Sequence, residues 1–142
     1  MNANRSVPTA TVIPVLAYRD VAEAADWLCE AFGFRIRLRI GAHRAQLVLG
    51  DGALIVTQLG EGASKSPTEG WSHSVHVRVE DVDRHRERAE QYGAVILSPP
   101  DDYPYGERQY TTRDLGGHRW TFSQSIADVD PASWGATSIA LE

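Results

Sequence analysis

The chain has 142 residues, a formal net charge of −5 and a sequence pI near 5.5. That length can bury the core of one domain, and the acidic balance argues against nucleic acid or an anionic membrane as a partner. The single cysteine, Cys29, excludes an internal disulfide and a thiol-rich zinc site. Because residues 1–10 lack a secretory signal and no apolar run could span a bilayer, we expect a cytoplasmic protein.

The first half of the chain opens with a predicted strand and helix. Thr11 to Ala17 is apolar and β-branched, which is typical of a strand, and Pro14 favours an edge position for it. Asp20 is a good helix N-cap, and apolar residues then recur at helical spacing as far as Phe32. Gly33 stands where a helix-ending glycine belongs. The sequence therefore predicts a helix from residue 21 to residue 32.

Three strands are predicted after this helix, over residues 35–40, 44–49 and 53–59, with a hairpin signal at Asp51-Gly52. The first of them alternates strictly, and its aliphatic residues are expected to point inward: Ile36, Leu38 and Ile40. Its arginines share the other face: Arg35, Arg37 and Arg39. They indicate either an anionic ligand or protection of a sheet edge, and the edge interpretation is favoured.

The pattern restarts after residues 60–70, which have linker composition. A strand is predicted over 72–79, a helix over 82–92 with Asp81 as N-cap, and a strand over 94–97. A long loop then reaches Gly106, and long loops in compact domains are often lids. Residues 107–124 predict a hairpin with Trp120 and Phe122 on one face of its second strand, opposite Thr121.

The order strand, helix, strand, strand, strand thus occurs twice, and we interpret it as an internal repeat in an α+β protein. We expect a flexible arm at 1–10, a first βαβββ module at 11–60, a linker at 61–71, a second module at 72–125 and a tail at 126–142. Trp134 in the tail is too large to be left in water without cost. The tail is therefore expected to dock on the body or on a second chain.

The doubled module resembles the vicinal oxygen chelate superfamily, which includes glyoxalase I, bleomycin-resistance proteins, fosfomycin-resistance transferases and extradiol dioxygenases. Three segments carry the resemblance, which covers residues 10 to 125 roughly: Tyr18-Arg19-Asp20-Val21, Val79-Glu80-Asp81-Val82-Asp83 and Arg113-Asp114-Leu115-Gly116-Gly117-His118-Arg119-Trp120. It implies that the two modules combine in a cupped mixed sheet. It is much less specific for function, because one fold hosts many chemistries.

Metal-dependent members of that superfamily carry His or Gln on the first strand of each module and Glu on the last. The positions that match here are Ile13, Val56, Ser74 and Thr121. Aliphatic and hydroxyl side chains are poor ligands for divalent metals. The resemblance therefore implies no metal cofactor and points to the bleomycin-resistance members, which bind a drug without a metal of their own. A displaced metal site is the disfavoured alternative, with His73, His76 and Glu107 as its ligands.

Our first hypothesis is a metal-free protein that sequesters an aromatic or cationic compound, as a homodimer with pockets at its interface. Trp71, Tyr103 and Tyr105 are expected to stack on the ligand. Polar contacts are expected from Gln58, Ser74 and Thr121, and from whichever of Glu107 and Arg108 faces inward. The second hypothesis is a small lyase, isomerase or cyclase with His76 or Glu107 as acid–base group. A blander third is an accessory module for another protein.

The remaining histidines and the cysteine have plainer interpretations. His43 and His118 are expected to face solvent, and His85 to be partly buried against the sheet. His73 and His76 are three residues apart on one strand, so they are expected to face opposite sides, and passive packing is favoured for both. Cys29 is expected to pack within its helix.

Overall fold

The computed structural model describes residues 4–60 and 72–140, so the predicted linker and Trp71 lie outside the described residues. The first module contains β1 (Val15–Tyr18), α1 (Val21–Phe32), β2 (Arg35–Ile40), β3 (Arg44–Leu49) and β4 (Gly52–Gln58). Its strands form one sheet in the order β1-β4-β3-β2, in which β1 and β4 are parallel and the other pairs antiparallel. The arginine-bearing β2 is an edge strand, as its charges predict.

The second module repeats this topology with β5 (Val75–Arg78), α2 (Val82–Gln91), β6 (Val95–Tyr103), β7 (Glu107–Arg113) and β8 (Arg119–Ser125). The strand order β5-β8-β7-β6 matches that of the first sheet, again with one parallel pair. The α+β class and the doubled βαβββ module are therefore confirmed. None of the described helices is long and apolar enough to cross a membrane.

Both helices begin at the aspartates that the sequence identifies. The Asp20 carboxylate accepts the Glu23 N–H at 3.0 Å, and the Asp81 carboxylate accepts the Arg84 N–H at 3.1 Å. Gly33 adopts a left-handed conformation with φ 87°, and its N–H donates to the Cys29 carbonyl, which ends α1. These local signals fix where each helix starts and hence which face it turns toward its sheet.

An aromatic cluster joins the two helices to the second sheet. The Phe32 ring lies 5.1 Å from Trp120 and 4.8 Å from Phe122, and both partners are fully buried. Phe122 also packs on His85 of α2, with ring centroids 4.0 Å apart. Trp120 packs on Phe32 and Phe34 of the first module. The core is thus shared between the modules.

Two sequence-based expectations about element boundaries and faces are wrong. Residues 99–103 do not form a lid loop, because β6 continues to Tyr103 and pairs with β7 across Asp101–Gln109 and Tyr103–Glu107. The Pro99-Pro100 pair, which cannot donate to the ladder, falls within an interruption of the pairing rather than at its end. A β-bulge between Ile36 and Leu38 breaks the alternation of β2, so the arginines do not share one face: Arg39 turns toward α1, where it pairs with Asp26. Ile40 therefore lies on the opposite face and is 39% exposed.

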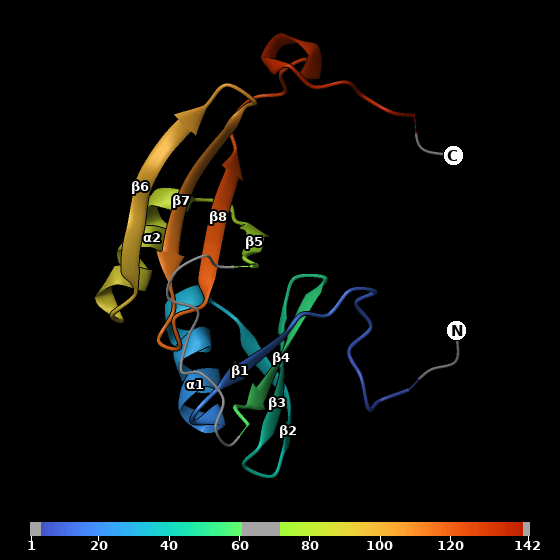
Figure 1. The fold of residues 1–142 in the computed structure, drawn as a ribbon, viewed down its shortest axis with the longest axis vertical. Coiled ribbons are helices and arrows are strands. Elements are labelled where there is room, and N and C mark those ends of the chain that lie inside the picture. The colour runs from blue at the N-terminus through green and yellow to red at the C-terminus, as the bar shows by residue number, and fades with distance from the viewer. Residues whose placement is uncertain (1–3, 61–71, 141–142) are drawn as a thin grey trace.

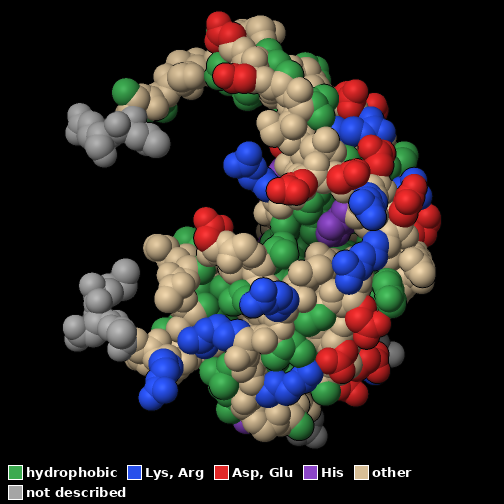
Figure 2. All heavy atoms as spheres, turned by 180° about the vertical axis from the view of Figure 1, so that it is seen from behind, with side chains coloured by type: hydrophobic (Ala, Val, Ile, Leu, Met, Phe, Trp, Pro, Cys, Tyr) green, Lys and Arg blue, Asp and Glu red, His purple; other side chains and the backbone are tan. Residues whose placement is uncertain are grey.

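The two sheets curve in the same sense, and the C-terminal tail extends from the upper end of the molecule (Figure 1); the space-filling view shows an open hollow on the concave side (Figure 2). Figure 2 shows hydrophobic side chains within this hollow and charged side chains around its rim. The tail is fixed at its root, where the N–H groups of Ile126 and Ala127 donate to the Gly106 carbonyl. A Cβ on Gly106 would lie 2.1 Å from the Ala127 oxygen, so only glycine allows this approach.

Candidate functional site

Strand alternation places a row of polar side chains on the face of the second sheet away from the helices. Trp120 and Phe122 point into the core, so Thr121 and Ser123 point the opposite way. In the parallel β5–β8 pair, His76 is the partner of Thr121 and Arg78 is the partner of Ser123. Polar groups from neighbouring strands thus collect on one face of the sheet.

A hydrogen-bond network crosses this face from β7 to β5. Tyr105 Oη donates to Gln109 Oε1 at 3.3 Å, and Gln109 Nε2 donates to Glu107 Oε1 at 3.1 Å. At the other end, His76 Nε2 lies 3.1 Å from Ser123 Oγ and 3.7 Å from Glu107 Oε1. We call these five residues the polar network. Of the pair Glu107 and Arg108, it is Glu107 that faces the site.

The network keeps Glu107 ionised. Burial raises the pKa of Glu107, but hydrogen bonds from Ser123 and Gln109 and the charges of His76 and Arg78 outweigh it, so the pKa lies below its ordinary value. His76 is not arranged as the base of a Ser-His-acid triad, because Ser123 and Glu107 both approach its Nε2 atom. The network therefore offers a carboxylate and an imidazole to a ligand rather than an activated serine.

A pocket of about 490 Å³ lies over the polar network. Its walls come from β5, β7, β8 and the first part of the tail, which contributes Ala127, Asp128 and Val129. Tyr105 lines it, and the Tyr105 ring stacks on Tyr103 with centroids 5.5 Å apart and an interplanar angle of 16°. Trp134 of the tail packs edge-on against Tyr105 at 5.5 Å, so the tail docks on the body. We call this cavity the second-sheet pocket.

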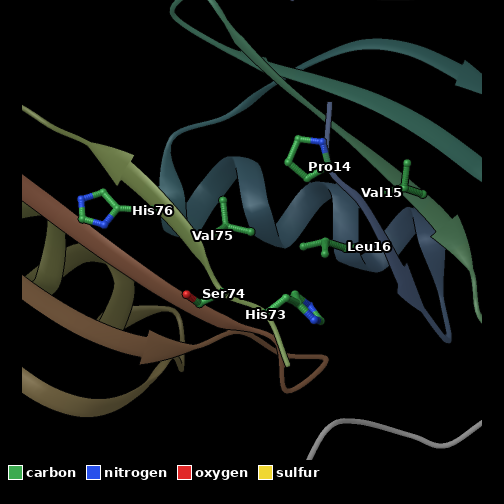
Figure 3. Close-up of a pocket in the computed structure, with 7 residues that line it drawn as sticks. All are labelled: Pro14, Val15, Leu16, His73, Ser74, Val75 and His76. Atoms are coloured by element: carbon green, nitrogen blue, oxygen red, sulfur yellow. The ribbon is translucent and has the colours of Figure 1, made fainter. Parts of the chain in front are cut away.

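A second crevice of about 450 Å³ separates the free edges of β1 and β5. Figure 3 shows these two strands side by side, with His76 pointing away from β1. Ser74 and His73 line this crevice and not the second-sheet pocket. His73 lies against His118, with ring centroids 5.7 Å apart. Ser74, which the sequence assigns to the ligand site, therefore lies in the crevice between β1 and β5 instead.

Three other sequence-predicted ligand residues lie apart from the second-sheet pocket or at its margin. Arg108 points toward α2, where it forms a two-pronged ion pair with Asp83 at 3.0 Å. Gln58 shares the helix-facing side of β4 with the buried Val56. Thr121 does lie on the site face and shares a 3.2 Å hydrogen bond with Thr111.

His118 is buried and not solvent-facing, which corrects the expectation from its position after two glycines. Its Nε2 lies 2.8 Å from the Ala17 carbonyl of β1, and the Tyr18 ring meets it edge-on. This burial arises because the β7–β8 turn folds against the first module. His43 is exposed, as expected.

The residues that face the hollow at the metal-ligand strands do not fit a divalent metal. The repeat aligns Val15 with His76 on the first strands and Ile55 with Thr121 on the last strands. Val56, the position matched from the sequence, points into the core, so its neighbour Ile55 is the relevant residue. Among the described residues no three His, Cys, Asp or Glu side chains gather as a metal site, so the displaced set with His73 is not assembled.

The N-terminal arm covers the corresponding face of the first sheet. Gln46 Nε2 donates to the Ser6 carbonyl at 2.8 Å, and Arg37 Nη2 donates to the Arg5 carbonyl at 3.1 Å. Pro8 is buried in the same segment. Gln46 faces away from α1, since its neighbours Ala45 and Leu47 belong to the core. The arm thus occupies the first sheet's share of the hollow and leaves the second sheet open.

The residues of the second-sheet pocket or its network that sequence reasoning missed include Arg78, Gln109, Ser123 and Asp128. The first three could have been found from alternation, because they stand two residues from His76, Glu107 and Thr121 on the same strands. Asp128 could not, because its place depends on how the tail is held at Gly106.

Comparison with known proteins gives consistent matches along most of the chain. The sequence family described as Glyoxalase/Bleomycin resistance protein/Dioxygenase superfamily matches residues 10–122. The crystal structure of TioX from Micromonospora sp. ML1 is 42% identical, covers 81% of this chain and 98% of its own, and superposes with a TM-score of 0.67. An uncharacterized protein of Mycobacterium tuberculosis (strain H37Rv) is 28% identical over 131 residues, 82% of this chain and 75% of its own.

A more distant structure shares the fold. A mutant of the fosfomycin resistance protein FosX of Listeria monocytogenes, in complex with Mn(II) and 1S,2S-dihydroxypropylphosphonic acid, superposes with a TM-score of 0.67. It is 14% identical, and the match covers 84% of this chain and 93% of FosX. At that identity the likeness concerns the fold alone.

Proposed function

The chain belongs to the glyoxalase/bleomycin resistance protein/dioxygenase superfamily, and we propose that it sequesters an aromatic or cationic small molecule in the second-sheet pocket without a resident metal. The observation that carries this proposal is the polar network beneath the stacked Tyr103–Tyr105 pair. An ionised Glu107 and an aromatic face complement a cation attached to a ring. Sequestration of a toxic compound would give the protein a role in drug resistance.

The proposed absence of a metal rests on the residues at the ligand strands. Val15 and Ile55 cannot coordinate a cation, and Thr121 is a weak ligand next to the lone His76. Binding energy must then come from desolvated aromatic contacts and charge-assisted hydrogen bonds, which suit reversible storage of a compound.

Removing either the aromatic ring of Tyr105 or the negative charge of Glu107 should weaken binding of 2-phenylethylamine, a simple aromatic cation. We expect about a tenfold loss for Tyr105→Ala and for Glu107→Gln, because a cation–π contact or a charge-assisted hydrogen bond contributes about 1.4 kcal/mol or more. Isothermal titration calorimetry measures both. Tyr92→Ala, at an exposed tyrosine that ends α2, is the matched control and should bind as the wild type does. Equal affinity in all four proteins would contradict the proposal.

A second candidate, a lyase or isomerase, is favoured by the partly exposed His76–Glu107 pair beside the pocket. Mass spectrometry of compounds that bind distinguishes the two functions. Turnover that disappears in both His76→Ala and Glu107→Gln supports the enzyme, whereas unchanged compound in the presence of wild-type protein supports sequestration.

We also infer that the protein works as a homodimer. The tail leaves apolar surface uncovered: Trp134 is still 41% exposed although it packs against Tyr105, and Ile139 is 83% exposed. Apolar side chains on a projecting segment favour burial against another chain. Light scattering after size-exclusion chromatography should give twice the 15.6 kDa mass of one chain. A mass of one chain at every concentration tested would contradict the dimer.

A further inference from the structure

The second-sheet pocket holds opposite charges on opposite sides. Arg78 enters it from β5, whereas Glu107 enters from β7 and Asp128 from the tail. Strand β8 lies between β5 and β7, so the backbones at Arg78 and Glu107 are roughly 10 Å apart, two strand spacings. The pocket is therefore dipolar, with a cationic side and an anionic side.

Two of these three charges, those of Arg78 and Asp128, are uncommitted. His76 and Glu107 are held in the polar network. Arg78 and Asp128 are both exposed, and neither side chain has a hydrogen bond or ion pair to any residue in the described ranges 4–60 and 72–140. Arg78 acts on Glu107 only through its charge, which helps to lower the Glu107 pKa. A guanidinium and a carboxylate thus face the cavity with their hydrogen-bonding capacity unused by the fold.

A ligand whose only charge is positive gives the Arg78 guanidinium no anionic partner, and the two positive charges repel each other. A carboxylate in the ligand corrects this, because the planar guanidinium binds carboxylates through two parallel hydrogen bonds. An ammonium group is then matched by Glu107 together with Asp128, and an attached ring reaches Tyr105. The volume of about 490 Å³ is in the range of small-ligand pockets.

We propose that the second-sheet pocket binds a zwitterion, the ammonium-and-carboxylate end of an amino-acid-like compound that carries an aromatic group. This inference rests on the proposed function, because it concerns the same pocket. Arg78 binds the carboxylate, Glu107 and Asp128 bind the ammonium group, and Tyr105 stacks on the ring. The compound need not be a free amino acid, since an exposed peptide-like end presents the same groups.

Three probes with one ring and different charges test the proposal by NMR titration of the full chain. Phenylalanine is the zwitterion, 2-phenylethylamine lacks its carboxylate, and 3-phenylpropionate lacks its ammonium group. We expect phenylalanine to bind about tenfold tighter than either of the others. The reason is that one charge-assisted hydrogen-bonded pair changes the affinity by about a factor of ten. In Arg78→Gln, phenylalanine affinity should fall to that of 2-phenylethylamine. In Glu107→Gln, it should fall to that of 3-phenylpropionate.

Arg35→Gln and Glu87→Gln are matched controls, because both residues are exposed on elements outside the pocket, and they should preserve the tenfold preference. If phenylalanine and 2-phenylethylamine bind equally, or if Arg78→Gln retains the preference, the zwitterion proposal is overturned while the proposed binding of aromatic cations stands. If none of the three probes binds, both fail. Arg78 is exposed and makes no contact that the fold needs, so Arg78→Gln should fold normally.

Discussion

Replacing Asp114 by alanine is expected to lower the free energy of unfolding by about 4 kcal/mol, because a buried carboxylate that satisfies several buried donors is lost. Asp114 accepts hydrogen bonds from Tyr18 Oη at 2.5 Å, from Trp120 Nε1 at 2.9 Å, and from the backbone N–H groups of Gly116 and His118. Tyr18 belongs to the first module, whereas the other donors belong to the second. The carboxylate therefore ties the modules together.

The environment of Tyr18 supports this assignment. Burial, followed by the charge of Asp114 and the hydrogen bond to it, raises the Tyr18 pKa well above its ordinary value, so the hydroxyl keeps the proton that it donates. Without Asp114, the Tyr18 hydroxyl and the Trp120 indole N–H are left buried without acceptors.

Urea denaturation followed by circular dichroism measures the change. Asp26→Ala is the matched control, because it removes only an exposed ion pair with Arg39 and should cost less than about 1 kcal/mol. Asp114→Asn should lie between the two, since the amide keeps an acceptor but loses the charge. A loss below about 1 kcal/mol in Asp114→Ala would show that the carboxylate does not hold the modules together.

Acid should destabilise the protein well above the range in which carboxylates titrate, because the partly buried His85 is held in its neutral form. Its Nε2–H donates to the Phe32 carbonyl at 3.2 Å, and its Nδ1 accepts from the Tyr110 hydroxyl at 2.6 Å. Burial lowers the pKa of His85 to about 4; the Phe32 hydrogen bond opposes this and the Arg88 charge adds to it.

The unfolded chain binds the proton at the ordinary His85 pKa of 6.5, above the folded value of about 4. Between these values the unfolded state holds more protons, so the free energy of unfolding rises with pH. The contribution is complete above pH 6.5 and is lost as the pH falls toward 4. At about 1.36 kcal/mol per unit, the loss is about 2 kcal/mol by pH 5 and about 3 kcal/mol by pH 4.

Urea midpoints at pH 7, 6 and 5 measure this slope, and His85→Gln is the comparison because glutamine does not titrate. The wild type should lose about 2 kcal/mol between pH 6.5 and pH 5, whereas the variant starts from a lower stability and stays level. An NMR titration that places the His85 pKa near 6.5, or a level wild-type curve over this range, would contradict the assignment.

Local signals predicted most of the fold. The bounds of α1, β2 and β3 agree with the sequence because capping residues, strict alternation and turn glycines act over a few residues. The repeat predicted the second module from the first. The extension of β6 was missed because Pro99-Pro100 is typical of a loop, whereas here it interrupts a ladder that resumes at Asp101.

The candidate site was less predictable because it depends on contacts between distant segments. Alternation shows that Glu107 and Arg108 point to opposite faces, but only Asp83 on α2 explains why Arg108 is the one turned away. His118 is buried by β1 of the other module, whose Ala17 stands 101 residues earlier in the chain. The N-terminal arm is likewise held over the first sheet by long-range hydrogen bonds, which the sequence pattern does not reveal.

The most direct test of metal-free binding in the second-sheet pocket is an NMR titration of 2-phenylethylamine in the presence of EDTA. Saturable shifts centred on the amides of His76, Glu107 and Ser123 are expected, unchanged when a divalent metal replaces the chelator. Binding that requires the metal, or shifts centred on the β1–β5 crevice around Leu16 and Ser74, would contradict the proposal.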